Sequence, residues 1–341
     1  MISQKIAQTT FTLSCGEYKR TRPLLDARVR PEKFELKIIP DPFPKQGMLP
    51  DYQQTRNQKM IKERAFDICE LGMAPYVSAR AEGVPLTAIP VFHYRRFRHP
   101  YIFAREKIRQ PGDLVGRRVG VRRLNLSAGL WARGLLQHEY DVPLDRITWV
   151  VSIDVLIHPK VRNRLAIETI PPGQSLETLL LRGEIDAMIE ASTVQPVTDV
   201  NSGIHRLLGE DTRQLEVDYY TRTGIFPIMH TVVLWDEHLS KYPDLPEQLH
   251  RTFLKARTVG ADDPDLPQRY VLAEEERLWW QSLTPFQRQK MQGDSSRDPW
   301  VYSLREDRKT LETFLDYAYE QGLTPTRYEL EELFAASTLD S

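Results

Sequence analysis

Short apolar, β-prone segments alternate with amphipathic segments along the first two thirds of the 341-residue chain, and this alternation constrains the fold most. The stretches that predict strands are residues 11–16, 34–40, 65–72, 86–92, 116–121, 146–151, 184–191 and 228–235. Residues 127–140 predict a helix that is capped near Ser127, and residues 175–183 predict a helix with Ser175 as N-cap and Gly183 as its stop. Alternating strands and helices favour an α/β fold with mainly parallel sheets, because such strands are joined by right-handed crossovers.

A helix-to-strand unit occurs twice, about 120 residues apart, which indicates two α/β lobes of related design. The late strand at 228–235, and the mostly helical region that follows Pro243, need a sheet to pack on. We therefore expect the chain to leave the first lobe near residue 100 and to return near residue 226. The prediction is a first lobe of residues 1–100 plus 226–341, a second lobe of residues 101–225, and a ligand cleft between them. Two consecutive domains are the alternative.

Composition excludes several classes of protein. Lys and Arg number 46 and Asp and Glu 47, so the net charge of −1 gives no general attraction to nucleic acid or to an acidic membrane. No run approaches the roughly 18 apolar residues of a membrane span, and residues 1–15 lack the apolar core of a secretory signal, so we expect a cytoplasmic protein. Cys15 and Cys69 have no metal-ligand spacing and are interpreted as buried small side chains. Motifs for phosphate, nucleotide or lysine-bound cofactors are missing, and no cofactor is predicted.

The densest charge in the chain lies at residues 93–99, HYRRFRH, between two β-prone runs. An extended backbone would send Arg95, Phe97 and His99 to one side and Arg98 to the other. If this segment crosses between the lobes, its arginines could hold a dianionic ligand through bidentate contacts. A solvated basic linker is the alternative.

A second basic cluster, with Arg20 and Arg22, follows the first predicted strand, where ligand contacts of α/β sheets gather. Unpaired surface arginines are common, and the cluster taken alone favours that interpretation. At the entry of the second lobe, Ser127 and the first turn of its helix offer an anion site, although a simple structural cap explains the same residues.

Two glutamates and two basic residues complete the candidate set. Glu70 and Glu190 end corresponding strands of the repeated unit and could act as base, acid or ligand anchor, or could pair with the arginines. Arg222 and His230 surround the predicted return crossing. His230 is either a hydrogen-bonded structural residue or a partner of His99, because the two histidines belong to adjacent crossings.

Several segments together resemble the 4,5-dihydroxyphthalate decarboxylase family over nearly the full length of the chain. They are CGEYKRTRPLLDARVRPE (15–32), IPVFHYRRFRHPYIF (89–103), YYTRTGIFPIMHTVV (219–233), RKTLETFLDYAYEQGL (308–323) and EELFA (331–335). The resemblance implies the fold of type 2 periplasmic solute-binding proteins, which have two α/β lobes joined by two crossings. It also implies conversion of 4,5-dihydroxyphthalate to protocatechuate and carbon dioxide.

By position, the family's motifs are matched by Arg20 and Arg22, by Arg95, Phe97, Arg98 and His99, and by Arg222 and His230. The sequence departs from the family's pattern at His93, Tyr94, Arg96 and the segment 69–76.

The implied chemistry needs groups that hold two carboxylates, accept a phenolic proton and deliver a proton to a ring carbon. Arg22, Arg95 and Arg98 are predicted to hold the carboxylates. His99 or His230 would be the general acid and the other the base, and the sequence leaves the order open. No metal is predicted, because the spacing of His93, His99 and His230 does not indicate a ligand set.

Two other functions stay open at this level. One is a cytosolic binding or sensor protein for an aromatic or other small dicarboxylate, because a fold does not fix a function. The other is a sibling decarboxylase of another hydroxybenzoate. The expected partner is the small aromatic dicarboxylate, with no nucleic acid and no membrane, and a homo-oligomer is compatible with the chain's size.

Overall fold

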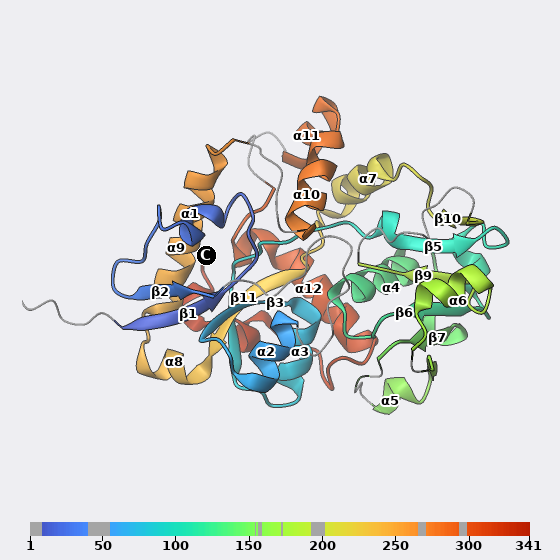
Figure 1. Cartoon of the computed structure of the whole chain (residues 1–341), viewed down its shortest axis with the longest axis horizontal. Helices are drawn as coiled ribbons and strands as arrows, with labels where there is room; N and C mark the ends of the chain where they lie inside the picture. Colours follow the sequence, from blue (N-terminus) through green and yellow to red (C-terminus); the bar gives the residue numbers. More distant parts are fainter. Residues whose placement is uncertain are drawn as a thin grey trace, which may run out of the picture.

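The computed structural model describes residues 9–39, 55–153, 155, 159–171, 173–191, 202–264, 271–292 and 299–341. Two lobes are visible, each built around one β-sheet with helices against its faces (Figure 1). The predicted two-lobed α/β fold with a helical C-terminal region is confirmed.

The first sheet combines four early strands with one strand from far along the chain. It contains β1 (Thr10–Ser14), β2 (Glu35–Ile38), β3 (Ile68–Gly72), β4 (Leu86–Ile89) and β11 (His230–Trp235), in the order β2-β1-β3-β11-β4. β1 is parallel to β2 and β3, whereas β11 is antiparallel to both of its neighbours, β3 and β4. The late strand therefore packs in the interior of the first sheet, and this insertion fixes the position of His230 next to β3.

The second sheet contains six strands in the order β10-β5-β9-β6-β7-β8. They are β5 (Ile102–Arg105), β6 (Arg118–Val121), β7 (Thr148–Val151), β8 (Ala166–Thr169), β9 (Ala187–Ile189) and β10 (Ile204–Arg206). Five strand pairings in the two sheets are parallel and four are antiparallel among the described residues, so the sheets are mixed rather than dominated by parallel pairs. Every antiparallel pairing involves β5, β10 or β11. β5 and β11 adjoin the segments that run between the lobes, so they enter their sheets without a crossover helix.

Helices surround both sheets. In chain order, α1 (Arg22–Leu25), α2 (Arg56–Glu63) and α3 (Met73–Ala81) lie between strands of the first sheet, and α8 (Asp236–Lys241) and α9 (Leu245–Ala261) follow β11. α4 (Ser127–Glu139), α5 (Pro159–Arg162) and α6 (Leu176–Arg182) lie between strands of the second sheet, and α7 (Arg213–Thr223) follows β10. The C-terminal helices are α10 (Val271–Ser282), α11 (Pro285–Gln292), α12 (Leu304–Glu320) and α13 (Leu330–Leu333). α6 has the predicted ends, because the Ser175 hydroxyl accepts a hydrogen bond from the Thr178 N–H and Gly183 has a φ of 76°.

Two segments between the lobes run antiparallel and are hydrogen-bonded to each other. The Arg96 N–H donates to the Pro227 carbonyl at 3.0 Å, and the Met229 N–H donates to the Tyr94 carbonyl at 2.9 Å. We call residues 90–101 the first crossing and residues 224–229 the second crossing. Their pairing places the basic motif of residues 93–99 beside the start of β11. The predicted lobe boundaries at residues 100 and 226 stay a prediction.

Candidate functional site

A buried carboxylate in β3 is the centre of the densest polar network near the crossings. Glu70 is fully buried and accepts hydrogen bonds from the Gly16 N–H at 2.7 Å and the Tyr18 hydroxyl at 2.8 Å. The Arg56 guanidinium lies 3.3 Å from the same carboxylate and also donates to the Glu70 carbonyl at 2.8 Å. The loop after β1 and the start of α2 therefore both converge on Glu70.

His230 is the fourth partner of this carboxylate. Its Nδ1 lies 2.6 Å from Glu70 Oε1, because β11 pairs with β3 in a register that places His230 opposite Gly72. Burial favours a raised pKa for Glu70, but the Arg56 charge and the His230 hydrogen bond outweigh it and hold the pKa of Glu70 well below its usual range. An ionised Glu70 keeps the Nδ1 proton of His230, so Nε2 is the nitrogen that can exchange a proton with a ligand.

Arg98 presents an unsatisfied guanidinium at the start of the second lobe. Its Nη2 donates to the Glu190 and Ala191 carbonyls, both at 2.8 Å, and its Cζ lies 4.2 Å from the centre of the Tyr101 ring. Nε and Nη1 are buried and have no hydrogen-bond partner within the described part of the chain, and the same holds for the Tyr94 hydroxyl. Buried polar atoms in native proteins are nearly always satisfied, so these three atoms indicate where an anionic ligand could bind.

His99 is a buried, neutral imidazole. Burial, followed by the charge of Arg98, lowers the pKa of His99 to about 4. Its ring contacts Phe97 and Tyr219, and its Nδ1 has no hydrogen-bond partner among the residues described. His230 instead lies beside Tyr94, with ring centroids 5.3 Å apart. Within the described residues, no hydrogen bond or ring contact joins the two histidines.

The second lobe adds Ser127 and Glu190. The Ser127 hydroxyl accepts a hydrogen bond from the Ala74 N–H at 3.0 Å, which joins the start of α4 to the start of α3. The helix is not capped by a side chain, because its N-cap is Leu126, so the expected cap near Ser127 is wrong. Glu190 is buried and lies 3.1 Å from Arg122 Nη2, and burial raises the pKa of its carboxyl group.

Arg95 and Arg222 are ion-paired away from Glu70 and Arg98. Arg95 is buried and makes a bidentate pair with Asp307 of α12, at 2.7 and 2.5 Å. Arg222 is exposed at the end of α7 and pairs with Glu139. The structure therefore separates Arg95 and Arg222 from the cluster around Glu70 and Arg98.

The remaining predicted residues lie in the first crossing or follow β1. Arg20 donates to the His93 carbonyl and pairs with Glu276 at 2.5 Å. Arg22 begins α1, 3.8 Å from Glu17. The Phe97 ring stacks on Phe226 of the second crossing at 4.9 Å.

Sequence reasoning missed Tyr18 and Arg56, which both contact Glu70, and gave Tyr94 no role. Tyr18 lies inside the family-like segment 15–32 and could have been chosen there. No feature of the sequence indicates Arg56 as a site residue, because an arginine in the polar stretch QQTRNQK is typical of a solvated helix surface. In the structure Arg56 is buried and contacts Glu70, 14 residues further along the chain.

No three His, Cys, Asp or Glu side chains come together as a metal-binding group in the part of the chain that the structure describes. None of the helices described there has the length and apolar character needed to cross a bilayer.

The fold and the site define a class: a two-lobed α/β protein of the periplasmic-binding-protein type, with buried cationic and imidazole groups near the crossings. The periplasmic aliphatic sulphonate-binding protein SsuA of Escherichia coli is similar over 98% of this chain and 99% of its own, with a TM-score of 0.50 and 13% identity. A periplasmic sulfonate-binding protein SsuA of Methylobacillus flagellatus is similar over 96% and 92% of the two chains, with a TM-score of 0.52 and 12% identity. At these identities the likeness concerns the fold alone.

The curated relatives are more specific, although no protein-family model matches the chain. A 4,5-dihydroxyphthalate decarboxylase of Comamonas testosteroni is 28% identical over 98% of this chain and 99% of its own. Another from Pseudomonas putida is 30% identical over 52% of this chain and 69% of its own. The chain belongs to the 4,5-dihydroxyphthalate decarboxylase family, as the sequence motifs predicted.

Proposed function

We propose that this chain is a carboxy-lyase that converts 4,5-dihydroxyphthalate to protocatechuate and carbon dioxide. The observation on which the proposal depends is the His230–Glu70 pair at 2.6 Å, with the open nitrogens of Arg98 on the neighbouring crossing. Membership of the decarboxylase family supports the reaction class. The dianionic substrate suits a site whose buried arginine has two unused donors.

The reaction requires a proton at the ring carbon that bears the departing carboxylate. Loss of the phenolic proton para to that carbon pushes electron density onto it, and a general acid then protonates it. The carbon–carbon bond breaks next, its electron pair returns to the ring, and carbon dioxide leaves. The ring gains one proton in exchange for carbon dioxide, and that proton is resupplied by water.

His230 is the better general acid of the two histidines. Its Nδ1 is hydrogen-bonded to the Glu70 carboxylate, which fixes the orientation of the ring and leaves Nε2 as the nitrogen that can transfer a proton. His99 is neutral near pH 7, because burial and the charge of Arg98 lower the pKa of its imidazole to about 4. Two carboxylates of a bound substrate would raise the pKa of His99, which makes it a stronger acceptor for the phenolic proton. The two histidines have separate surroundings, as groups acting at opposite ends of one ring require.

Arg98 is assigned to the carboxylate that stays on the ring. A guanidinium on the departing carboxylate would mainly stabilise the ground state and would slow the loss of carbon dioxide. On the retained carboxylate, the Nε and Nη1 donors can fix the position of the ring without this cost. Glu190 and Ala191, whose carbonyls hold Arg98 Nη2, orient the guanidinium.

The test is direct. Purified protein is incubated with 4,5-dihydroxyphthalate, with and without a chelator, and protocatechuate and carbon dioxide are measured together. We expect equimolar products, and no reaction with phthalate, which lacks the para hydroxyl. Binding without turnover would replace the proposal with a sensor, and neither binding nor turnover would favour a sibling decarboxylase of another hydroxybenzoate.

His230→Gln tests the assignment of the acid. We expect its kcat to fall by roughly 10²- to 10⁴-fold, with KM little changed, because a general acid contributes about that much. His205→Gln is the matched control, because His205 lies on β10, at the edge of the second sheet. An unchanged kcat in His230→Gln would remove His230 from the mechanism.

A further inference from the structure

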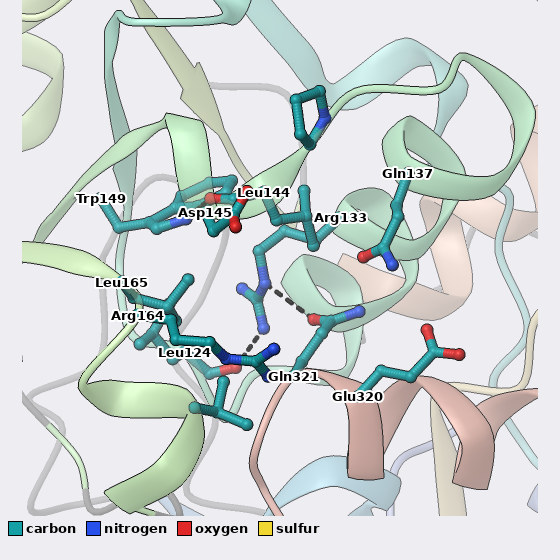
Figure 2. Close-up of a pocket in the computed structure, with 12 residues that line it drawn as sticks. Leu124, Arg133, Gln137, Leu144, Asp145, Trp149, Arg164, Leu165, Glu320 and Gln321 are labelled. Carbon is teal, nitrogen blue, oxygen red and sulfur yellow. Dashed lines mark hydrogen bonds between the residues drawn. The ribbon is translucent and has the colours of Figure 1, made fainter.

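A pocket lies apart from Glu70 and His230, between α4, β7 and the C-terminal end of α12 (Figure 2). Its volume is about 280 Å³, close to the lower end of the roughly 300–1,000 Å³ of small-molecule sites. Leu124, Trp149 and Leu165 supply apolar walls, and Arg133 and Gln321 supply polar groups. The residues come from the second lobe and from the C-terminal helical region, so the pocket joins the two.

Arg133 is the unusual feature of this pocket. It is only 2% exposed, yet no carboxylate contacts its guanidinium among the described residues. Nε donates to the Gln321 side-chain oxygen at 2.8 Å and Nη2 donates to the Leu124 carbonyl at 2.6 Å, as Figure 2 shows. Nη1 is buried and has no hydrogen-bond partner in the described ranges. A buried cation held only by neutral oxygens is costly, and it is the kind of group that an incoming anion would satisfy.

Burial also makes the Arg133 guanidinium more acidic. Burial lowers the pKa of Arg133 to about 9, so the guanidinium still has its proton near pH 7. The Trp149 ring lies 5.7 Å away and contributes a favourable cation–π contact, but no charge. The site therefore presents one buried positive charge with one unused donor.

The rim of the pocket selects against highly charged anions. Asp145 and Glu320 are exposed and lie at the pocket together with the exposed Arg164. Glu320 also bonds His138 Nε2 at 2.7 Å. Two carboxylates outnumber the one arginine at the mouth and disfavour a phosphate or a dicarboxylate, whereas a single carboxylate on a small apolar body fits both the one buried donor and the apolar walls.

We propose that this pocket binds a small monocarboxylate with an apolar body, whose carboxylate accepts a hydrogen bond from Arg133 Nη1. The ligand contacts α4 through Arg133 and the end of α12 through Gln321. Gln321 also donates to the Leu130 carbonyl at 3.1 Å. An occupied pocket therefore stabilises the contact between the second lobe and the C-terminal helices.

Benzoate is the probe, and titration calorimetry with thermal melting is the measurement. Wild-type protein should bind one benzoate in this pocket. Arg133→Met should weaken binding by about tenfold or more, the equivalent of a lost charge-assisted hydrogen bond. Gln321→Glu keeps the number of heavy atoms in the side chain and gives Arg133 an internal counter-ion, although it loses the N–H that donates to the Leu130 carbonyl. It should weaken benzoate binding similarly while thermal melting shows that the protein stays folded.

Arg98→Gln distinguishes this pocket from the proposed catalytic site. Benzoate binding should be retained in Arg98→Gln, and benzamide, which has no charge, should not bind the wild type. Loss of benzoate binding in Arg98→Gln with retention in Gln321→Glu would overturn the proposal, because the probe would then occupy the catalytic site. Absence of benzoate binding, or binding of inorganic phosphate in its place, would overturn it as well.

Discussion

Two histidines of the first crossing are buried as neutral imidazoles, at a cost that depends on pH. Burial lowers the pKa of His93 to about 3 and, together with Arg98, that of His99 to about 4. The unfolded chain binds these protons near pH 6.5. At pH values between the folded and the unfolded pKa, the unfolded state therefore binds more protons than the folded state. The free energy of unfolding must then fall as the pH drops below about 6.5.

We predict that His99 alone contributes about 2 kcal/mol to the loss of unfolding free energy between pH 7 and pH 5. Urea unfolding of wild type and His99→Gln at both pH values measures it. The variant should lose less stability on acidification than the wild type, by about that amount. Equal losses in the two proteins would show that His99 is already solvated or protonated at pH 7.

At the residue scale, the sequence predicted the segments that form the candidate site more accurately than the individual side chains. Arg95 and Arg98 belong to one motif and look equivalent in the sequence. They differ because Arg95 meets Asp307, 212 residues further along the chain, whereas two nitrogens of Arg98 have no partner among the described residues. Such distinctions arise from long-range packing, which periodicity and composition do not record.

Elements were predicted well where local sequence decides them. The ends of α6 follow from Ser175 and Gly183, and β3 and β11 follow from apolar runs. The run after residue 99 was interpreted as β-prone and contains β5, but β8 and β10 were not predicted, nor was the antiparallel direction of β11. Strand direction is set by how the chain re-enters a sheet after a crossing, and no residue of the strand itself specifies it.

The packing of α4 on α12 depends on one glycine. A Cβ on Gly134 would lie 2.1 Å from two ring carbons of Tyr317. Gly134→Ala should therefore destabilise the protein by about 1–3 kcal/mol, the usual cost of overpacking. Thermal unfolding measures it, with Gly112→Ala as the control because a Cβ there meets nothing within 4 Å. Adding Tyr317→Leu to Gly134→Ala should recover part of the lost stability. If the effects of the two substitutions on the free energy of unfolding simply add, the contact is refuted.

At the scale of the whole molecule, the paired crossings are fastened to elements of both lobes. Arg95 ties the first crossing to α12 through Asp307, and the Trp131 indole of α4 donates to the Ile228 carbonyl of the second crossing at 2.9 Å. The crossings thus form one hydrogen-bonded ribbon rather than two independent linkers. Relative movement of the lobes would have to bend this ribbon as a unit.

The Arg95–Asp307 pair allows the structural role of the basic motif to be separated from its predicted role in binding. Arg95→Met leaves Asp307 buried without its cation, which should cost about 3–5 kcal/mol of unfolding free energy. The double variant Arg95→Met/Asp307→Leu removes both charges, so most of this stability should return. Because both terminal nitrogens of Arg95 are paired with Asp307, the double variant should also keep the wild-type KM for 4,5-dihydroxyphthalate, whereas Arg98→Gln should raise it. A raised KM in the stable double variant would return Arg95 to the substrate site and would mean that its pairing with Asp307 is exchanged for the ligand.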